Sequence, residues 1–317
     1  MKDGRSDMNK KPVWIDTDTG VDDAVALVLA STLKQIELVG ASAVAGNTSL
    51  QNAFRNCRNV LSLVGREDVK VFPGADRPLV IDLHTAEYAH GQNGLGGAII
   101  PMSKAPEETM KAWDALYETA KEYQGELIVC AVGPLTNIAI AIAKHPDIVG
   151  MIRELNIMGG AADGGNVTPC AEFNIYSDPQ AAEAVLRSGI KVNLFGLDVT
   201  HKAYLTEEDV KEIAAIGNRV SDLFRDSKRS MFEQWRKFYE KGICEHDSCP
   251  VMYTAYPDWF EGHKCGIYVE TQGTITFGKT VTDLWTDYKF EDRHCQIFLN
   301  VDRDKFAERI KEAYRSF

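Results

Sequence analysis

Residues 13–26 read VWIDTDTGVDDAVA and hold four carboxylates between two apolar runs, namely Asp16, Asp18, Asp22 and Asp23. The apolar run before them predicts a buried β-strand, and the run after them predicts a buried helix. So many anions at a strand-to-helix junction repel one another unless a cation lies among them. Helix capping is the simpler alternative for Asp22 and Asp23, but it leaves Asp16 and Asp18 unexplained. The stretch therefore predicts a site for a hard cation, Ca²⁺ or Mg²⁺ rather than Zn²⁺.

The composition restricts the class of protein. The chain has 317 residues, 44% of them hydrophobic, which is enough for a sizeable core. Its net charge of −11 argues against nucleic acid or an anionic membrane as a partner. Seven scattered cysteines without CxxC spacing are typical of reduced thiols. Residues 1–11 are polar and predict a flexible N-terminus rather than a signal peptide, so we expect a cytoplasmic protein.

Short β-branched runs alternate with helix-period segments in the first two thirds of the chain. The expected strands are residues 13–15, 36–44, 127–132, 152–158 and 192–197, and the expected helices are residues 22–33, 48–64, 107–123, 135–144 and 178–188. This alternation predicts an α/β fold with an open, mainly parallel, twisted sheet flanked by helices. No linker or repeat divides the sequence, so we expect residues 1–317 to form one domain.

The last third of the chain has a different pattern. Residues 206–209 resemble a capping box, and a helical region runs from there to about residue 239. Residues 267–270 and 274–277 predict β segments, and residues 303–315 predict a terminal helix. We expect these pieces to decorate the sheet.

Polar loops follow several of the predicted strands. Asn47 ends the second strand, and residues 165–174 place Asn166, Glu172 and Asn174 in one loop. The carboxyl ends of parallel strands are where ligands bind in open α/β sheets, and this density of amides and acids suits a polyhydroxylated ligand. Each residue alone could instead be a turn or cap residue, and His246 alone could be a structural histidine. Their shared position at one sheet edge favours a binding site.

The chain resembles the inosine-uridine preferring nucleoside hydrolases, whose signature is DxD[PT]GxDDxxA. Residues 16–26 match that signature in full. Further matching blocks are residues 45–47, 132–137, 158–160, 166–174, 196–200 and 246–247, and their spacing fits from Val13 to about Asp302. The resemblance implies a Rossmann-like nucleoside hydrolase fold and hydrolysis of ribonucleosides, of the pyrimidine or inosine type, to ribose and free base. It also implies a role in nucleoside salvage and a homodimer or homotetramer.

The resemblance assigns roles to the acidic cluster. The ligands of a Ca²⁺ ion would be Asp18, Asp23, Asp247 and the carbonyl oxygen of Val132. Asp18 would also be the base that activates water, since an ionised carboxylate beside a cation can accept the proton. Asp16 would support these residues from behind. The ribose would contact the remaining polar residues and one methionine, namely Asp22, Asn47, Met158, Asn166, Glu172 and Asn174.

The departing base needs a proton or strong stabilisation. His246 is the expected donor, because imidazole titrates near neutrality. The resemblance places Gln234 and Phe238 near the base, or Trp235 and Tyr239 in a different helix register. His90 lies in a glycine-rich loop that could close over the base.

Two other functions fit parts of the pattern. Residues 16–19 resemble the DxDxT motif of haloacid-dehalogenase-type phosphohydrolases, which does not account for Asp22, Asp23 or the loop at residues 166–174. A non-catalytic nucleoside- or sugar-binding protein on the same scaffold would not need the complete set of acids.

Overall fold

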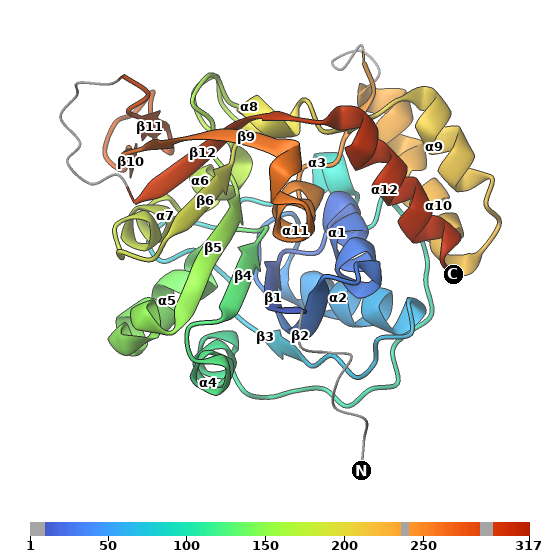
Figure 1. The fold of residues 1–317 in the computed structure, drawn as a ribbon, viewed down its shortest axis with the longest axis horizontal. Coiled ribbons are helices and arrows are strands. Elements are labelled where there is room, and N and C mark those ends of the chain that lie inside the picture. Colours follow the sequence, from blue (N-terminus) through green and yellow to red (C-terminus); the bar gives the residue numbers. More distant parts are fainter. Residues whose placement is uncertain (1–9, 236–240, 286–293) are drawn as a thin grey trace.

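A computed structural model describes residues 10–235, 241–285 and 294–317 (Figure 1). Its centre is an eight-stranded sheet in the order β3-β2-β1-β4-β5-β6-β12-β9. These strands are β1 (Lys11–Thr17), β2 (Ile36–Ala43), β3 (Val71–Pro73), β4 (Leu127–Ala131), β5 (Ile152–Met158), β6 (Val192–Phe195), β9 (Phe260–Cys265) and β12 (Cys295–Val301). Every neighbouring pair is parallel except β12 and β9. The expected mainly parallel α/β sheet is confirmed.

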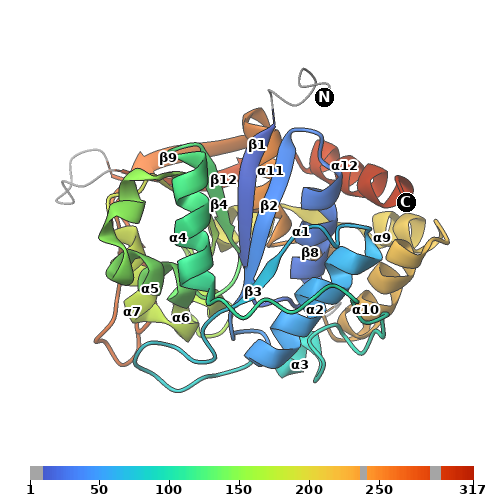
Figure 2. The ribbon, with the colours of Figure 1, turned by 90° about the horizontal axis from the view of Figure 1, so that it is seen from below.

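Helices cover both faces of this sheet (Figure 2). One face carries α1 (Val21–Thr32), α2 (Leu50–Leu63), α9 (Glu207–Ala214), α10 (Arg219–Trp235), α11 (Ser248–Ala255) and α12 (Arg303–Arg315). The other face carries α4 (Ala112–Tyr123), α5 (Thr136–Lys144) and α7 (Pro179–Leu186). The short elements are α3 (Glu87–His90), α6 (Phe173–Ser177), α8 (Leu197–Thr200) and the 3₁₀ turns η1 (Pro146–Gly150) and η2 (Pro257–Trp259). Two further ribbons pair β7 (Tyr204–Leu205) with β8 (Ile243–Cys244) and β10 (Ile267–Val269) with β11 (Thr280–Thr282).

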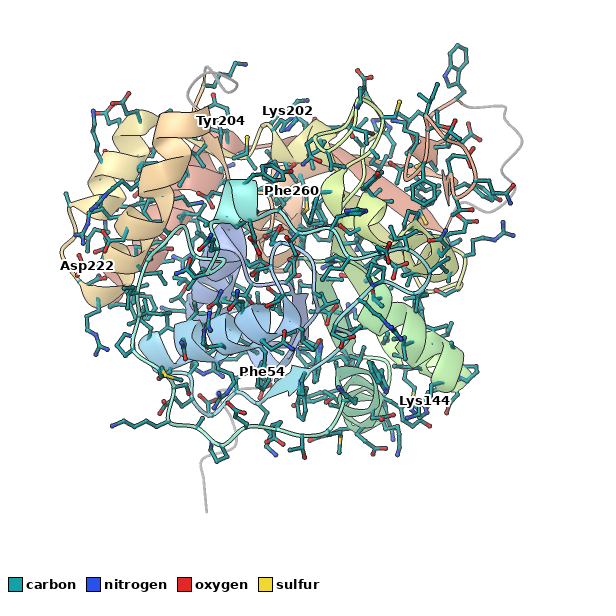
Figure 3. The ribbon with its side chains drawn as sticks, turned by 180° about the vertical axis from the view of Figure 1, so that it is seen from behind. Phe54, Lys144, Lys202, Tyr204, Asp222 and Phe260 are labelled. Carbon is teal, nitrogen blue, oxygen red and sulfur yellow. The ribbon has the colours of Figure 1, made fainter. Side chains whose placement is uncertain are left out.

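The two faces of the sheet bury two separate apolar cores. Successive side chains of a strand point to opposite faces, so Val13 and Ile15 join the core under α1 while Trp14 joins the core under α4. Charged side chains such as Lys144 and Asp222 lie at the periphery of the layers (Figure 3). Among the residues that the structure describes, no helix is both long and apolar enough to cross a bilayer.

Several expectations for the last third of the chain are wrong. The helical region after residue 206 is broken into α9 and α10, because Gly217 adopts a φ of 79° between them. Residues 274–277 form bends and a turn rather than a strand, since the N–H of Gly278 donates to the carbonyl of Glu270 and the N–H of Glu270 donates to the carbonyl of Lys279, which closes a loop there. The terminal helix is confirmed as α12, and the capping box at Thr206 and Asp209 begins α9.

Three strands of the central sheet, β3, β9 and β12, were not predicted. The strand β12 pairs with β6, so residues near the C-terminus complete the same sheet that begins with β1. The end of the chain therefore does more than decorate the sheet. At the other end, Lys11 is not part of a flexible segment, because it starts β1 and its Nζ donates to the carbonyl oxygen of Thr254 at 2.7 Å. Residues 1–9 lie outside the described residues.

Trp14 is the largest fully buried side chain of β1, and it packs directly over the neighbouring strand. Its Nε1 donates to Ser42 Oγ at 2.8 Å, and its ring stacks on Phe72 at 5.6 Å between centroids. A Cβ added to Gly40 would lie 2.5 Å from the Trp14 ring, so only glycine fits beneath it.

We expect Gly40→Ala to lower the free energy of unfolding by about 1–3 kcal/mol, because the fixed indole ring has no room to move away. Urea denaturation measures this change. Gly150→Ala is the matched control, since a Cβ there meets nothing within 4 Å. An equal stability of both variants would contradict the proposed packing.

Candidate active site

The order in which successive strands join the sheet changes direction at β1, and the candidate site lies at the carboxyl end of this strand. From β1 the sheet extends to β2 on one side and to β4 on the other. In such sheets the loops at the carboxyl ends of these strands diverge and leave a crevice. Asp18 follows β1, Asn47 follows β2, Val132 follows β4 and Met158 ends β5. The predicted polar loops therefore meet at one edge of the sheet, at the carboxyl ends of these strands.

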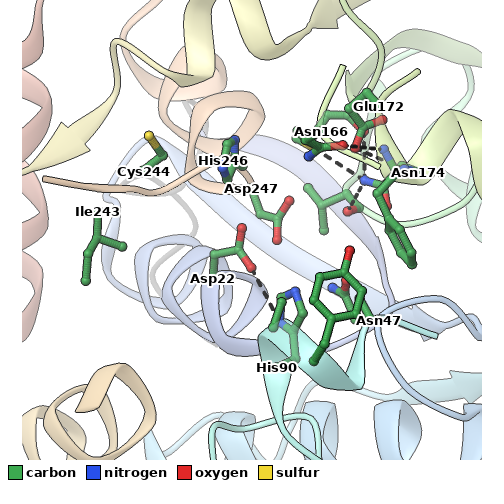
Figure 4. A pocket seen from close by; sticks show the side chains of 16 residues that line it. Asp22, Asn47, His90, Asn166, Glu172, Asn174, Ile243, Cys244, His246 and Asp247 are labelled. Atoms are coloured by element: carbon green, nitrogen blue, oxygen red, sulfur yellow. Dashed lines mark hydrogen bonds and ion pairs between the residues drawn. The ribbon is translucent and has the colours of Figure 1, made fainter. Parts of the chain in front are cut away.

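A cavity lies at this edge, and Figure 4 shows its side chains. The predicted residues that line it are Asp22, Asn47, His90, Val132, Met158, Asn166, Glu172, Asn174, His246 and Asp247. The carboxylates of Asp22 and Asp247 lie side by side, while Glu172, Asn166 and Asn174 gather across the cavity (Figure 4). Asp247 thus comes from the start of α11, far along the sequence, to meet the acids of the first loop.

The acidic cluster is buried and crowded. Asp22, Asp23 and Asp247 each offer a carboxylate oxygen within 4.8 Å of the others. Burial and the neighbouring carboxylates raise the pKa of Asp18, Asp23 and Asp247. Burial would also raise the pKa of Asp22, but at the low pH where Asp22 titrates, His90, His246 and Lys228 are positively charged and hold its pKa below the usual value. A cluster of this kind is destabilised by its own charge.

The donor atoms fit a hard divalent cation. Asp18 Oδ1 and Asp22 Oδ1 are buried and accept no hydrogen bond within the described parts of the chain. Buried acceptors are normally satisfied, so these two oxygens indicate a missing partner with positive charge. Every candidate donor here is a carboxylate or carbonyl oxygen, which suits Ca²⁺ or Mg²⁺ and not a thiolate-binding metal.

The expected helix capping also occurs, alongside the cluster. Asp23 Oδ2 accepts from the backbone N–H of Gly20, the N-cap residue of α1, at 2.7 Å. Its Oδ1 accepts from the hydroxyl of Thr17, and Asn47 Nδ2 donates to its Oδ2 at 3.1 Å. Asp18 Oδ2 accepts from the backbone N–H of Asn47 at 2.6 Å. These bonds fix the direction in which both carboxylates point.

Asp16 lies behind the cluster, outside the cavity lining. Its Oδ1 accepts from Ser42 Oγ and from Asn137 Nδ2, the latter at 2.7 Å. Burial raises the pKa of Asp16 to about 7. Asn137 also donates to the carbonyl of Ala43 and accepts from the N–H of Ala75, so it links the ends of β1 and β2 to the loop after β3.

The polar side of the cavity is fixed by backbone groups. Glu172 caps α6, and its carboxylate accepts from the N–H groups of Asn174, Gly160 and Ile175 at 2.9, 2.9 and 3.2 Å. Asn174 Nδ2 donates to the carbonyl oxygens of Val132 at 2.9 Å and Met158 at 3.2 Å. Burial raises the pKa of Glu172 to about 7. Glu172 is therefore both a cap, as the simpler interpretation had it, and part of the cavity lining.

The two histidines of the cavity are held by their Nδ1 atoms. His90 Nδ1 accepts from the N–H of Val21 at 3.1 Å, which leaves the proton of the neutral ring on Nε2. His246 Nδ1 lies 2.8 Å from Thr200 Oγ1. Burial lowers the pKa of both rings, that of His246 to about 4. The expectation that His246 titrates near neutrality is therefore wrong, because the ring is buried.

The loop that carries His90 is tied to its surroundings rather than loose. Asn56 Nδ2 donates to the carbonyl oxygens of Thr19 and Asn93, at 3.2 and 2.8 Å. Asn93 in turn bridges three further backbone groups of the loop.

Several residues at the mouth of the cavity were not predicted. Tyr88, Ile243, Cys244 and Phe173 line it. Tyr88 is two residues before His90, and Cys244 is two before His246, so sequence proximity was the only available signal. The predicted Gln234 lies in α10 but its side chain is not described, and Phe238 lies outside the described residues, as does Tyr239. The side chain of Trp235 is also not described.

Comparisons with known proteins agree with this geometry. The family model "Inosine-uridine preferring nucleoside hydrolase" matches residues 13–308. The chain belongs to this family. It is 34% identical to a pyrimidine-specific ribonucleoside hydrolase, RihA, of Photobacterium profundum, over 97% of this chain and 99% of the relative.

Solved structures show the same fold. A plant nucleoside hydrolase, PpNRh1, superposes with a TM-score of 0.91 at 28% identity, covering 97% of this chain and 99% of that one. A purine-preferring ribonucleoside hydrolase from Gardnerella vaginalis gives 0.90 at 30% identity, covering 97% and 100%. The family membership makes the chain a ribonucleoside hydrolase, an N-glycosyl hydrolase, and favours this function over both the phosphohydrolase and the non-catalytic alternative.

The carboxylate cluster predicts how stability responds to a cation. In cation-free protein, we expect Asp247→Asn to raise the free energy of unfolding by on the order of 1 kcal/mol, because one repelling charge is gone. In the parent, a divalent cation at a hundred times its Kd should add about 2.7 kcal/mol, and Asp247→Asn should lose most of that gain.

Chemical denaturation after chelation, with and without added Ca²⁺ or Mg²⁺, measures both effects. Asp76→Asn is the control, because that carboxylate is exposed and does not line the cavity. If neither Ca²⁺ nor Mg²⁺ changes the free energy of unfolding of the parent protein, a cation site in the cluster is excluded.

Proposed function

We propose that this enzyme hydrolyses the N-glycosidic bond of ribonucleosides to ribose and free base, with pyrimidine nucleosides preferred and Ca²⁺ as its cation. The observation that carries the proposal is the burial of four acids beside a polar cavity at the switch point of the sheet. The name of the RihA relative supports the pyrimidine preference.

Asp18, Asp23, Asp247 and the carbonyl of Val132 would hold the cation, as the resemblance implies. When bound, Ca²⁺ neutralises the cluster, orients hydroxyl groups and makes a nearby water more acidic. Asp18 Oδ1 has no hydrogen-bond partner within the described chain, so it is available to accept a proton. We assign Asp18 as the general base.

The polar wall would bind the ribose. Asp22, Asn47, Asn166, Glu172 and Asn174 present oxygens and amides to the cavity, with Met158 beside them. Loss of the base leaves an electron-poor, oxocarbenium-like sugar. Carboxylates that are already fixed by backbone N–H groups stabilise that charge without having to reorganise.

The two histidines would face the departing base. Both are neutral at neutral pH, because burial lowers their pKa. A neutral imidazole still donates its ring N–H. In His90 this proton is on Nε2, since Nδ1 accepts from Val21. We therefore assign His246 and His90 as hydrogen-bond donors that stabilise the leaving base.

Base release from uridine, cytidine, inosine and adenosine tests the function. We expect the highest kcat/KM for uridine or cytidine, loss of activity with a chelator, and recovery on addition of Ca²⁺. At saturating Ca²⁺, Asp18→Asn should lower kcat/KM by about 10³-fold or more, because the substitution removes the proton acceptor and one ligand of the cation.

The control for this substitution is Asp76→Asn, which should keep the parent kcat. Tight nucleoside binding without base release by the parent would refute hydrolysis. Normal turnover by Asp18→Asn would refute the assignment of the base.

Glu172 predicts a pH dependence. Its ionised form accepts hydroxyl hydrogen bonds and stabilises positive charge, and its pKa is raised to about 7. As the pH falls below about 7, the carboxyl group gains a proton, so kcat/KM should fall, approaching tenfold per pH unit. Glu172→Gln should be slow throughout and should lack this step. A parent profile that stays flat from about pH 8 to pH 5 would contradict this role.

A further inference from the structure

The helix α10 supports both of the histidine-bearing loops at two consecutive residues. Ser227 contacts the loop of His90, and Lys228 contacts the segment that carries His246. Both residues are buried. The two loops come from opposite sides of the cavity, so this one turn of helix fixes their positions relative to each other.

Lys228 forms a fully buried ion pair with Glu245, the residue before His246. Lys228 Nζ lies 2.7 Å from Glu245 Oε1 and donates to Oε2 at 2.9 Å. The two side chains are 1% and 0% exposed. The backbone N–H of Glu245 also donates to the carbonyl of Ala203 at 2.9 Å, so the residue is held at both its main chain and its side chain.

The His90 loop meets α10 with no free space between them. A Cβ added to Gly96 would lie 2.1 Å from the carbonyl oxygen of Ser227, so only glycine permits this approach. The N–H of Gly96 donates to the carbonyl oxygen of His90 at 2.7 Å. The position of the His90 main chain therefore depends on where α10 lies.

Stability alone does not explain the buried ion pair. Taking two charges out of water costs about as much as their attraction returns, and an apolar pair of similar volume is often as stable. Unlike an apolar pair, an ion pair fixes the orientation of its two side chains, because both carboxylate oxygens contact one ammonium group. Here the ion pair fixes the position of Glu245, the residue next to His246.

We propose that Lys228 is a positioning residue of the reaction: through Glu245 it sets the place of His246, and through α10 it sets His246 relative to His90. This inference rests on the proposed function, in which both histidines face the leaving base. It predicts that the pair matters for leaving groups that need hydrogen bonding or a proton, and not for those that leave as stable anions.

The test compares the nucleoside that the parent turns over fastest with p-nitrophenyl β-D-ribofuranoside, whose phenolate leaves without a proton. The double variant Lys228→Met with Glu245→Leu removes both charges and leaves no unpaired ion. We expect its kcat for the nucleoside to fall about 30-fold or more, because the displaced histidines no longer donate hydrogen bonds to the leaving base. Its kcat for the phenyl riboside and its inhibition by ribose should stay within about threefold, since neither depends on that assistance.

Two further variants separate positioning from general damage. Lys228→Arg keeps the charge and the hydrogen bonds, so it should recover most of the nucleoside rate. Lys311→Met removes an ammonium that pairs with Asp209 on the far helices, 3.2 Å away, and should leave both substrates unchanged. Thermal unfolding of each variant verifies that it folds.

The outcomes distinguish the two proposals. A parent that releases base from no nucleoside would overturn the proposed function, and this inference with it. An active parent whose folded double variant keeps its nucleoside rate, or loses both substrates equally, would overturn the role of Lys228 alone.

Discussion

The repulsion among Asp18, Asp22, Asp23 and Asp247 is the constraint on which the rest of the structure depends. All four are buried at one sheet edge, where each ionised carboxylate makes the next harder to ionise. The fold offsets part of this with donors from the first loops: the N–H groups of Gly20 and Asn47 and the hydroxyl of Thr17. Asp18 Oδ1 and Asp22 Oδ1 still accept no hydrogen bond in the described chain. A protein that keeps such a cluster must gain from it, and the proposed binding of a cation and of a positively charged sugar would be that gain.

The base side of the cavity follows a different principle. Its histidines are partly buried and neutral: His90 Nδ1 accepts from the N–H of Val21, and His246 Nδ1 lies at hydrogen-bond distance from Thr200 Oγ1. A neutral donor does not compete with the cation for the carboxylates, whereas a charged imidazolium would. The lowered pKa values of the histidines and the raised values of Asp18, Asp23 and Asp247 are therefore two results of the same burial.

The sequence predicted the parts of the fold that depend on local pattern. The motif at residues 16–26, the five strands of the first two thirds and α12 follow from apolar runs and from residue types that suit caps and turns. The strands β9 and β12 were missed because their place in the sheet comes from pairing between distant segments, which no local pattern encodes. Lys228 and Glu245 were missed for the same reason: seventeen residues apart, they look like surface charges until the fold buries them. The neutral state of His246 also required the structure, since burial lowers its pKa.

The two halves of the cavity differ in how they are built, and this explains how one fold serves different bases. Asp18, Asp23 and Glu172 each accept from backbone N–H groups near the strand ends, which substitution of side chains does not remove. The base side is held by side chains from α10, α8 and the loops beside them. Side chains change without disturbing the sheet. Relatives named pyrimidine-specific and purine-preferring share this chain's sequence or fold over nearly its whole length. Under the proposed assignment, base preference would be free to vary on a support that keeps the bond-breaking chemistry fixed.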